Sequence, residues 1–144
     1  MATEFNWPVR VYYEDTDNGG VVYYANYLKF MERSRTEWLR AKGLEQDKLA
    51  SESGVIFAVR SAQVDYLKPA RFNQLLSVSA EVVETGKASI TFKQEVILTT
   101  NQSERMARGE VLCRGEIKIA CLDAQSFKPC AIPALVRKEI LSGS

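Results

Sequence analysis

One long amphipathic helix, expected from Asn26 to about Lys42, constrains the fold of this chain more than any other feature. Asn26 is expected to be its N-cap, and Gly43 is expected to end it. Charged residues fall mostly on one side, and side chains at helical spacing form a wide apolar face on the other. The members of this face are Tyr27, Phe30, Met31, Ser34 and Trp38. A single helix with such a face suits a curved sheet that wraps around it.

The other regular segments show the composition or the period of two that is typical of strands. About five strands are predicted, at residues 7–13, 55–67, 75–84, 89–100 and 109–123. Gly115 is expected to mark a β-bulge in the last of them. Residues 14–20, rich in Asp, Asn and Gly, are expected to form a loop, and residues 133–141 a short helix.

Short connections predict that the last four strands pair as antiparallel neighbours. One dominant helix against such a sheet gives an α+β fold, with the long helix wrapped by a curved antiparallel sheet. Pairing between two subunits would protect the open edge strands of this sheet, so a homodimer or a homotetramer is expected.

The length and the charge of the chain exclude several classes of protein. Its 144 residues are the size of one domain, and residues 1–144 are expected to form it. A net charge of +1 and the lack of a basic stripe give no support to a nucleic-acid partner. The apolar runs are too short to span a membrane, and the segment from Met1 to Trp7 does not read as a signal peptide.

The three cysteines, Cys113, Cys121 and Cys130, do not have the spacing of metal ligands. Cys113 and Cys121 fall on one predicted strand, about 26 Å apart, which is too far for a disulfide within the chain. Reduced thiols and a cytoplasmic location are therefore expected. Neither a metal site nor a cofactor is expected.

The sequence contains no histidine, and this absence excludes a large part of enzyme chemistry. A Ser-His-Asp or Cys-His site cannot form within this chain, and histidine-ligated zinc is impossible. Any acid–base step must use aspartate, glutamate, tyrosine, lysine, cysteine or a water held by the backbone.

Residues 13–27 concentrate acids, glycines and tyrosines in the sequence YEDTDNGGVVYYANY. One interpretation is a capped turn, in which Asp15 and Asp17 only accept hydrogen bonds from backbone N–H groups. The other is a catalytic loop, in which a carboxylate acts as a nucleophile or as a general base on water. The residues alone leave both interpretations open.

The longer segment VRVYYEDTDNGGVVYYANYLKFMERSRTEWLR resembles the signature of the hotdog-fold acyl-CoA thioesterases. The resemblance is to the hydroxybenzoyl-CoA thioesterase branch, and most of all to the bacterial thioesterases associated with the Tol-Pal system. It continues through YLKPARF at 66–72 to KPCAIP near the C-terminus, and so spans nearly the whole chain. It implies a hotdog fold and hydrolysis of a coenzyme A thioester, or an acyl carrier protein thioester, to a free acid.

By this resemblance Asp17 is the catalytic carboxylate and Asp15 is structural. Tyr13 also belongs to the catalytic group, either as a hydrogen-bond donor or, alternatively, only as an aromatic of the sheet. Tyr24 stands where close relatives carry histidine, and its backbone N–H is expected in an oxyanion hole at the helix N-terminus. Substrate contacts around this loop are expected from Gly19, Gly20, Val22 and Asn26.

Coenzyme A carries phosphates, so cations and hydroxyls at turns are candidates to bind it. Lys87 and Ser89, in the turn ETGKAS, come first, followed by Arg60 and Lys128. Each of these is also interpretable as a solvated surface side chain. A set of aromatic residues either borders an acyl pocket or packs in the core: Tyr23, Tyr24, Tyr27 and Phe57.

Two helix residues and two other functions complete the alternatives. Some distant hotdog thioesterases use a glutamate of the central helix as nucleophile, and Glu32 is the candidate for that role in this chain. Glu32 is also suited to pair with an arginine on the helix flank. Ser34 is expected to be a small residue that lets the sheet approach, since no histidine can activate it. Dehydratases of the same fold rely on histidine and are disfavoured, whereas a non-catalytic acyl-binding protein remains the alternative to a thioesterase.

Overall fold

The computed structural model describes residues 5–99 and 109–141, and in this part of the chain five strands form one antiparallel sheet in the order β1-β3-β4-β5-β2. The strands are β1 (Phe5–Arg10), β2 (Val55–Tyr66), β3 (Leu75–Thr85), β4 (Ser89–Leu98) and β5 (Val111–Asp123). The helical elements are a 3-10 turn η1 (Tyr13–Asp15), α1 (Asn26–Ala41), α2 (Gln46–Lys48), a π turn η2 (Leu49–Ser53) and α3 (Ala134–Leu141). The expected strand end at Thr100 and the first four residues of the expected domain lie outside the described residues.

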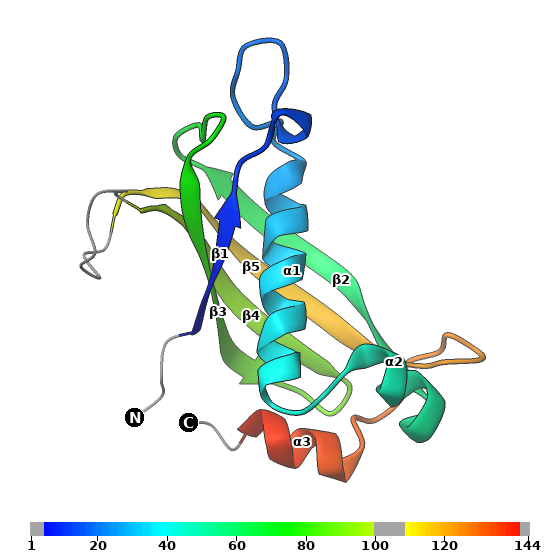
Figure 1. Ribbon diagram of the computed structural model, residues 1–144. Helices are drawn as coiled ribbons and strands as arrows, with labels where there is room; N and C mark the ends of the chain where they lie inside the picture. The colour runs from blue at the N-terminus through cyan, green and yellow to red at the C-terminus, as the bar shows by residue number, and fades with distance from the viewer. Residues whose placement is uncertain (1–4, 100–108, 142–144) are drawn as a thin grey trace.

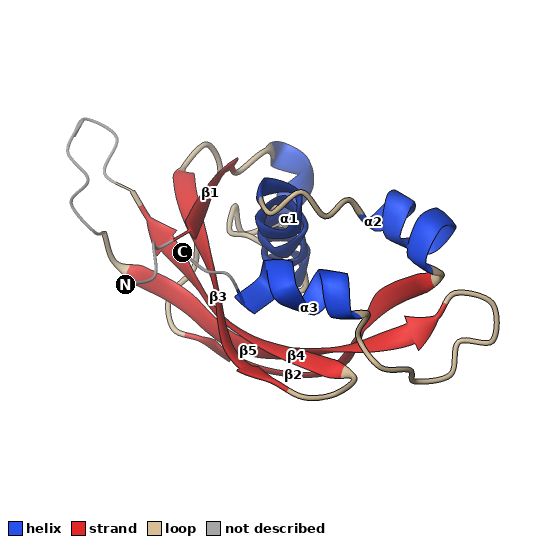
Figure 2. Cartoon of the chain, turned by 90° about the horizontal axis from the view of Figure 1, so that it is seen from below, coloured by secondary structure: helices blue, strands red, loops and turns tan. Residues whose placement is uncertain are grey.

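The sheet curves around α1, which lies across its concave face (Figure 1). Seen along the helix, α2 and α3 lie on the same side of the sheet as α1 (Figure 2). This arrangement confirms the expected α+β fold with a long helix against a curved antiparallel sheet. Within the described ranges, no helix is long and apolar enough to cross a membrane.

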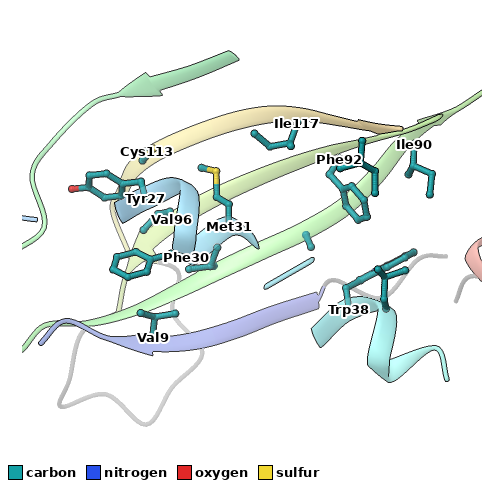
Figure 3. Packing of buried hydrophobic residues seen from close by; sticks show 14 of the residues in the cluster. Val9, Tyr27, Phe30, Met31, Trp38, Ile90, Phe92, Val96, Cys113 and Ile117 are labelled. Atoms are coloured by element: carbon teal, nitrogen blue, oxygen red, sulfur yellow. The ribbon is translucent and has the colours of Figure 1, made fainter. Parts of the chain in front are cut away.

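The apolar face of α1 is buried as predicted, and its side chains meet the concave face of the sheet (Figure 3). Phe30 and Met31 have no exposed surface, and Trp38 packs edge-to-face on Phe92 of β4 with ring centroids 5.3 Å apart. Burying an apolar side chain of this size contributes about 1.5–3 kcal/mol to the stability of the folded chain. The helix is therefore fixed mainly by these contacts with the sheet.

A buried polar cluster accompanies these apolar contacts. The Arg35 guanidinium donates to Oε1 of Gln94 at 2.9 Å, and Nε2 of Gln94 donates to the backbone carbonyls of Met31 and Ser79. Ser34 Oγ donates to a carbonyl of β3 at 2.8 Å, so this small residue both admits the sheet and bonds to it. Burial lowers the pKa of Arg35, and the nearby Glu32 carboxylate partly offsets that effect.

The first strand begins and ends earlier than the predicted residues 7–13, and the expectation for Val11, Tyr12 and Tyr13 is wrong. β1 ends at Arg10, and η1 begins at Tyr13. The carboxylate of Asp15 accepts the N–H of Tyr12 at 2.9 Å, while the Asp15 N–H donates to the carbonyl of Tyr12. These local bonds satisfy the backbone in a turn, so the strand cannot continue.

The expected N-cap of α1 is also wrong by one residue. Ala25 precedes the helix, and Asn26 is its first residue. The Asn26 side chain does not cap the helix but donates through Nδ2 to the backbone carbonyl of Asp15 at 2.9 Å. The helix ends at Ala41, and Gly43 follows with a φ of +82°, a left-handed conformation that suits glycine and stops the helix as predicted.

Two expectations about the sheet need correction. β2 and β3 follow each other in the sequence but are not neighbours, because β2 pairs with β5 at one edge while β3 lies between β1 and β4. Gly115 is not a bulge, since it pairs regularly with both Val64 and Gln94. A Cβ added to Gly115 would lie 3.1 Å from the Met31 side chain, so the glycine admits α1 close to β5.

Candidate active site

The acid-rich segment folds into a small hairpin that leads into α1. The Asp17 N–H donates to the carbonyl of Val21, and the Tyr23 N–H donates to the carbonyl of Asp15. Thr16 and Val22 form the isolated bridge between the two sides. This hairpin projects beyond one end of the sheet, at the N-terminus of α1 (Figure 1). Its position follows from the sequence, because turn-forming residues separate two short extended stretches.

The two acids of this hairpin differ in exposure. Asp15 is 6% exposed, and its side chain accepts the Tyr12 N–H while its backbone carbonyl accepts bonds from Tyr23 and Asn26. The carboxylate of Asp15 therefore stabilises the loop from within. A group with this burial and these partners is poorly placed to reach a substrate.

Asp17 is exposed, and its Oδ1 accepts the N–H of Gly19 at 2.9 Å. No hydrogen bond within the described residues uses its Oδ2, so one carboxylate oxygen faces solvent. Gly20 has a φ of +78° and donates its N–H to the Asp17 carbonyl, which makes the tight turn that presents this side chain. The geometry leaves Asp17 available as a nucleophile or a general base.

Unpaired backbone donors lie next to the start of α1. The amides of Asn26, Tyr27 and Leu28 each donate to a carbonyl three residues earlier. Across residues 5–99 and 109–141, by contrast, no hydrogen bond is donated by the amides of Tyr24 and Ala25. Free N–H groups at the positive end of a helix can stabilise a developing negative charge on oxygen.

Exposed aromatic side chains surround the hairpin. Tyr13 is 75% exposed and stacks on Phe72 with ring centroids 3.9 Å apart, so the interpretation of Tyr13 as an aromatic of the sheet is wrong. The Tyr24 ring contacts Tyr23 at 4.8 Å and Tyr66 at 5.8 Å. A side-chain hydrogen bond with Tyr24 raises the pKa of Tyr23, and burial raises the pKa of Tyr66.

Tyr66 and Phe72 were not among the predicted site residues. Both belong to the segment YLKPARF, which the sequence placed within the resemblance without giving it a role. That segment lies against the hairpin in the structure. Arg71 forms an isolated antiparallel β-bridge with Val21, and the Val22 N–H donates to the carbonyl of Ala70. A contact between two segments this far apart in the sequence has no local signal.

The remaining loop residues have mainly structural surroundings. Val22 is buried, with 5% of its surface exposed, and Asn26 is half-buried against the Asp15 carbonyl. Tyr27 is buried in the core, and its hydroxyl accepts the Ala70 N–H at 2.9 Å. Of the four aromatic residues considered for an acyl pocket, Tyr27 therefore belongs to the core, while Tyr23 and Tyr24 lie at the surface.

The predicted coenzyme A contacts do not lie beside Asp17 in this chain. Lys87 lies in the β3–β4 turn and Ser89 is the first residue of β4, and the 11 residues of β3 separate them from the hairpin by about 35 Å. The backbone carbonyl of Lys87 accepts bonds from Ile132 and Arg137, while its side chain is exposed. Arg60 is exposed at an irregularity of the edge strand β2.

A groove of about 110 Å³ lies between α1, α2 and the β2 side of the sheet. Glu32, Arg35, Phe57 and Val59 are among its lining residues. Glu32 accepts a hydrogen bond from Thr36 at 2.8 Å, and its charge acts to raise the pKa of Arg35. Among the described residues no ion pair joins Glu32 to an arginine, so the expected pairing on the helix flank is not observed. Phe57 is half-buried and forms part of the wall of this groove.

A metal site has no support in the part of the chain that is described, where no three histidine, cysteine or carboxylate side chains gather. The functional groups available at the hairpin are therefore a carboxylate, tyrosine hydroxyls and backbone amides.

The sequence is similar to those of known thioesterases over most of its length. Residues 19–104 match the model of a family described as the thioesterase superfamily. The chain is 42% identical over 133 residues to the acyl-CoA thioesterase YbgC of Haemophilus influenzae, and the match covers 92% of this chain and 91% of that protein. It is 40% identical over 138 residues to the acyl-CoA thioester hydrolase YbgC of Escherichia coli O6:H1, with 96% of each chain covered.

Solved structures agree with this fold. A mutant of 4-hydroxybenzoyl CoA thioesterase complexed with 4-hydroxybenzoyl CoA matches with a TM-score of 0.85, covering 96% of this chain and 99% of that chain. The sequence identity of that pair is 17%, so the likeness concerns the path of the backbone.

Proposed function

Because this chain belongs to the thioesterase superfamily and is a thioester hydrolase, we propose that it cleaves acyl-CoA thioesters with Asp17 as the catalytic carboxylate. The hotdog fold and the thioesterase family that the sequence indicated are both confirmed. The products are a free acid and coenzyme A.

The observation that carries this assignment is the contrast between the two acids of one hairpin. Asp15 is buried and its carboxylate holds the loop together, whereas Asp17 presents a carboxylate oxygen to solvent beside the N-terminus of α1. The free amides of Tyr24 and Ala25 supply donors for the oxyanion of the tetrahedral intermediate. Removing one donor from an oxyanion hole typically costs about 10²–10³-fold in rate.

Two routes for Asp17 follow from the chemistry of a thioester. As a nucleophile, the carboxylate attacks the acyl carbon, expels the thiolate and forms an anhydride that water then cleaves. As a general base, it takes a proton from the water that attacks the acyl carbon directly. A thiolate is a good leaving group, so neither route requires the imidazole that the chain lacks.

The coenzyme A contacts are proposed to come from a second copy of this chain. β2 is a 12-residue edge strand, so two copies can pair along it and protect both edges. Since Lys87 and Ser89 lie about 35 Å from the hairpin of their own chain, they would bind the phosphates of a thioester held at Asp17 of another protomer. Arg60, on the same edge strand, would lie at the interface.

The test is the release of thiol from a panel of short, long and aromatic acyl-CoAs, with an acyl carrier protein thioester included, by the wild type and by Asp17→Asn. We expect the variant to lose at least about 10²-fold in kcat, on the scale of a lost base or nucleophile. Asp123→Asn is the matched control, because Asp123 Oδ1 also accepts backbone N–H groups of a turn, at Gln125 and Ser126.

Full activity of Asp17→Asn would overturn the assignment and direct attention to Glu32. Thioester binding without turnover by the wild type would instead favour an acyl-binding protein. A single turnover in ¹⁸O-water tests the nucleophilic route for an active Asp17. Label recovered in the carboxylate of Asp17 requires an anhydride that water opens at the Asp17 carbonyl. An unlabelled Asp17 fits a general base and also fits an anhydride that water opens at the acyl carbonyl.

A further inference from the structure

Two of the three cysteines face each other at the end of the molecule opposite the hairpin. Cys121 lies near the end of β5, and Cys130 lies in the segment that returns beside it toward α3. Leu122 and Pro129 form an antiparallel bridge between these segments, and the Cys130 N–H donates to the Cys121 carbonyl at 2.9 Å. The register therefore places Cys121 directly opposite Cys130, and their Sγ atoms are 3.8 Å apart.

We propose that Cys121 and Cys130 form a modification site, a dithiol that small-molecule disulfides oxidise to an intrachain disulfide. Directly opposite residues of an antiparallel pair have Cα atoms about 4.5–5.5 Å apart, within the range of about 4.4–6.8 Å that disulfides span. The bond can thus form after small side-chain movements. Cys113 is 0% exposed on the same strand as Cys121, and the strand rise places the two about 26 Å apart.

The two thiols have different roles in this reaction. Cys130 is half-buried and so is the sulfur that a reagent reaches first, whereas Cys121 has no exposed surface. Burial, with the neighbouring Cys130 adding to it, raises the pKa of Cys121 to about 12. The thiolate of Cys121 is therefore scarce at neutral pH, and Cys121 is suited to act second, at short range.

The oxidation balances with glutathione disulfide as the oxidant. The Cys130 thiolate attacks one sulfur of glutathione disulfide, expels a glutathione thiolate and forms a mixed disulfide. Cys121 then loses its proton, attacks the sulfur of Cys130 and expels the second glutathione thiolate. The protein loses two electrons and two protons, and glutathione disulfide is reduced to two molecules of glutathione.

The product would fasten the C-terminal segment to the sheet. The Cys121 N–H already donates to Ala88 in the β3–β4 turn, and Ile132, just before α3, donates to Lys87 in the same turn. Arg137 of α3 donates to Gly86 and Lys87 there as well. A bond between Cys121 and Cys130 adds a covalent link at the point where these noncovalent contacts meet.

The test treats the folded full-length protein with glutathione disulfide, quenches it in acid, and alkylates it after denaturation. Trypsin does not cut before Pro129, so residues 119–137 form one peptide that contains both cysteines, while residues 109–114 carry Cys113. We expect the first peptide to be unalkylated and two hydrogens lighter than its reduced form. We expect the second peptide to be alkylated, which makes Cys113 an internal control.

Two variants assign the order of the steps. Cys121→Ser should accumulate a mixed disulfide of Cys130 with glutathione, and Cys130→Ser should leave Cys121 fully available for alkylation after denaturation. The proposal is overturned if the wild type keeps both thiols free, if it stops at the mixed disulfide of Cys130, or if it links two chains. The wild-type result decides the matter even if Cys121→Ser does not fold, because it depends on neither variant.

Discussion

Apolar and aromatic side chains are buried in the core beneath the centre of α1, whereas the aromatic side chains of the hairpin at its N-terminus are exposed. Phe30, Met31 and Phe92 have no exposed surface in the core. At the hairpin, by contrast, Tyr13 is 75% exposed and Tyr24 is 59% exposed. Apolar and aromatic groups stabilise a chain only when they leave water, so the hairpin aromatics contribute little to folding. This difference predicts that stability and activity can be changed separately.

The largest expected effect compares two phenylalanines. Phe92→Ala should lower the free energy of unfolding by about 3–5 kcal/mol, because it opens a cavity against Trp38 in a region with no exposed surface. Phe72→Ala should lower it by less than about 1 kcal/mol, because Phe72 is 40% exposed and stacks on the exposed ring of Tyr13. Urea unfolding of both variants measures the difference. Equal losses would show that the hairpin aromatics are part of the core.

The next effect concerns the buried polar cluster. Gln94→Leu should cost about 2–4 kcal/mol, because it leaves the buried Arg35 guanidinium and two backbone carbonyls without their partner. Gln125→Leu, in the exposed turn after β5, should change the stability by no more than about 0.5 kcal/mol. Urea unfolding again provides the measurement. A neutral Gln94→Leu would mean that the cluster determines the position of α1 without stabilising it.

The sequence predicted the core more completely than the site, for a physical reason. The face of α1 depends on a local period, so Tyr27, Phe30, Met31, Ser34 and Trp38 could be assigned from their spacing. The strand ranges followed in the same way, but the position of β2 beside β5 depends on contacts between distant segments. A bulge and a close helix contact both favour glycine, so Gly115 could not be assigned correctly from composition.

The hairpin could be predicted only in part for the same reason. Its acids and glycines are local, and its likeness to known thioesterases singled out Asp17. The Asp15 carboxylate accepts the N–H of Tyr12 within the turn, as the capped-turn interpretation predicted, whereas the stacking of Phe72 on Tyr13 joins residues far apart in the chain. That stacking exists only after the fold has formed, so no pattern within one segment indicates it.

The smallest expected effect on stability sharpens the comparison most. Gly43 and Gly20 both have a left-handed backbone, with φ of +82° and +78°, and a Cβ at either position would meet no atom within 4 Å. Gly43→Ala and Gly20→Ala should therefore each cost about 1 kcal/mol, since only the backbone conformation is strained.

Thioester hydrolysis should distinguish the two glycine variants. Gly43 ends α1 far from the hairpin, so its variant should keep wild-type turnover, whereas a shift of the turn at Gly20 moves Asp17 and should reduce kcat by about 10-fold or more. Equal activity of the two variants would show that the turn at Gly20 does not position the carboxylate.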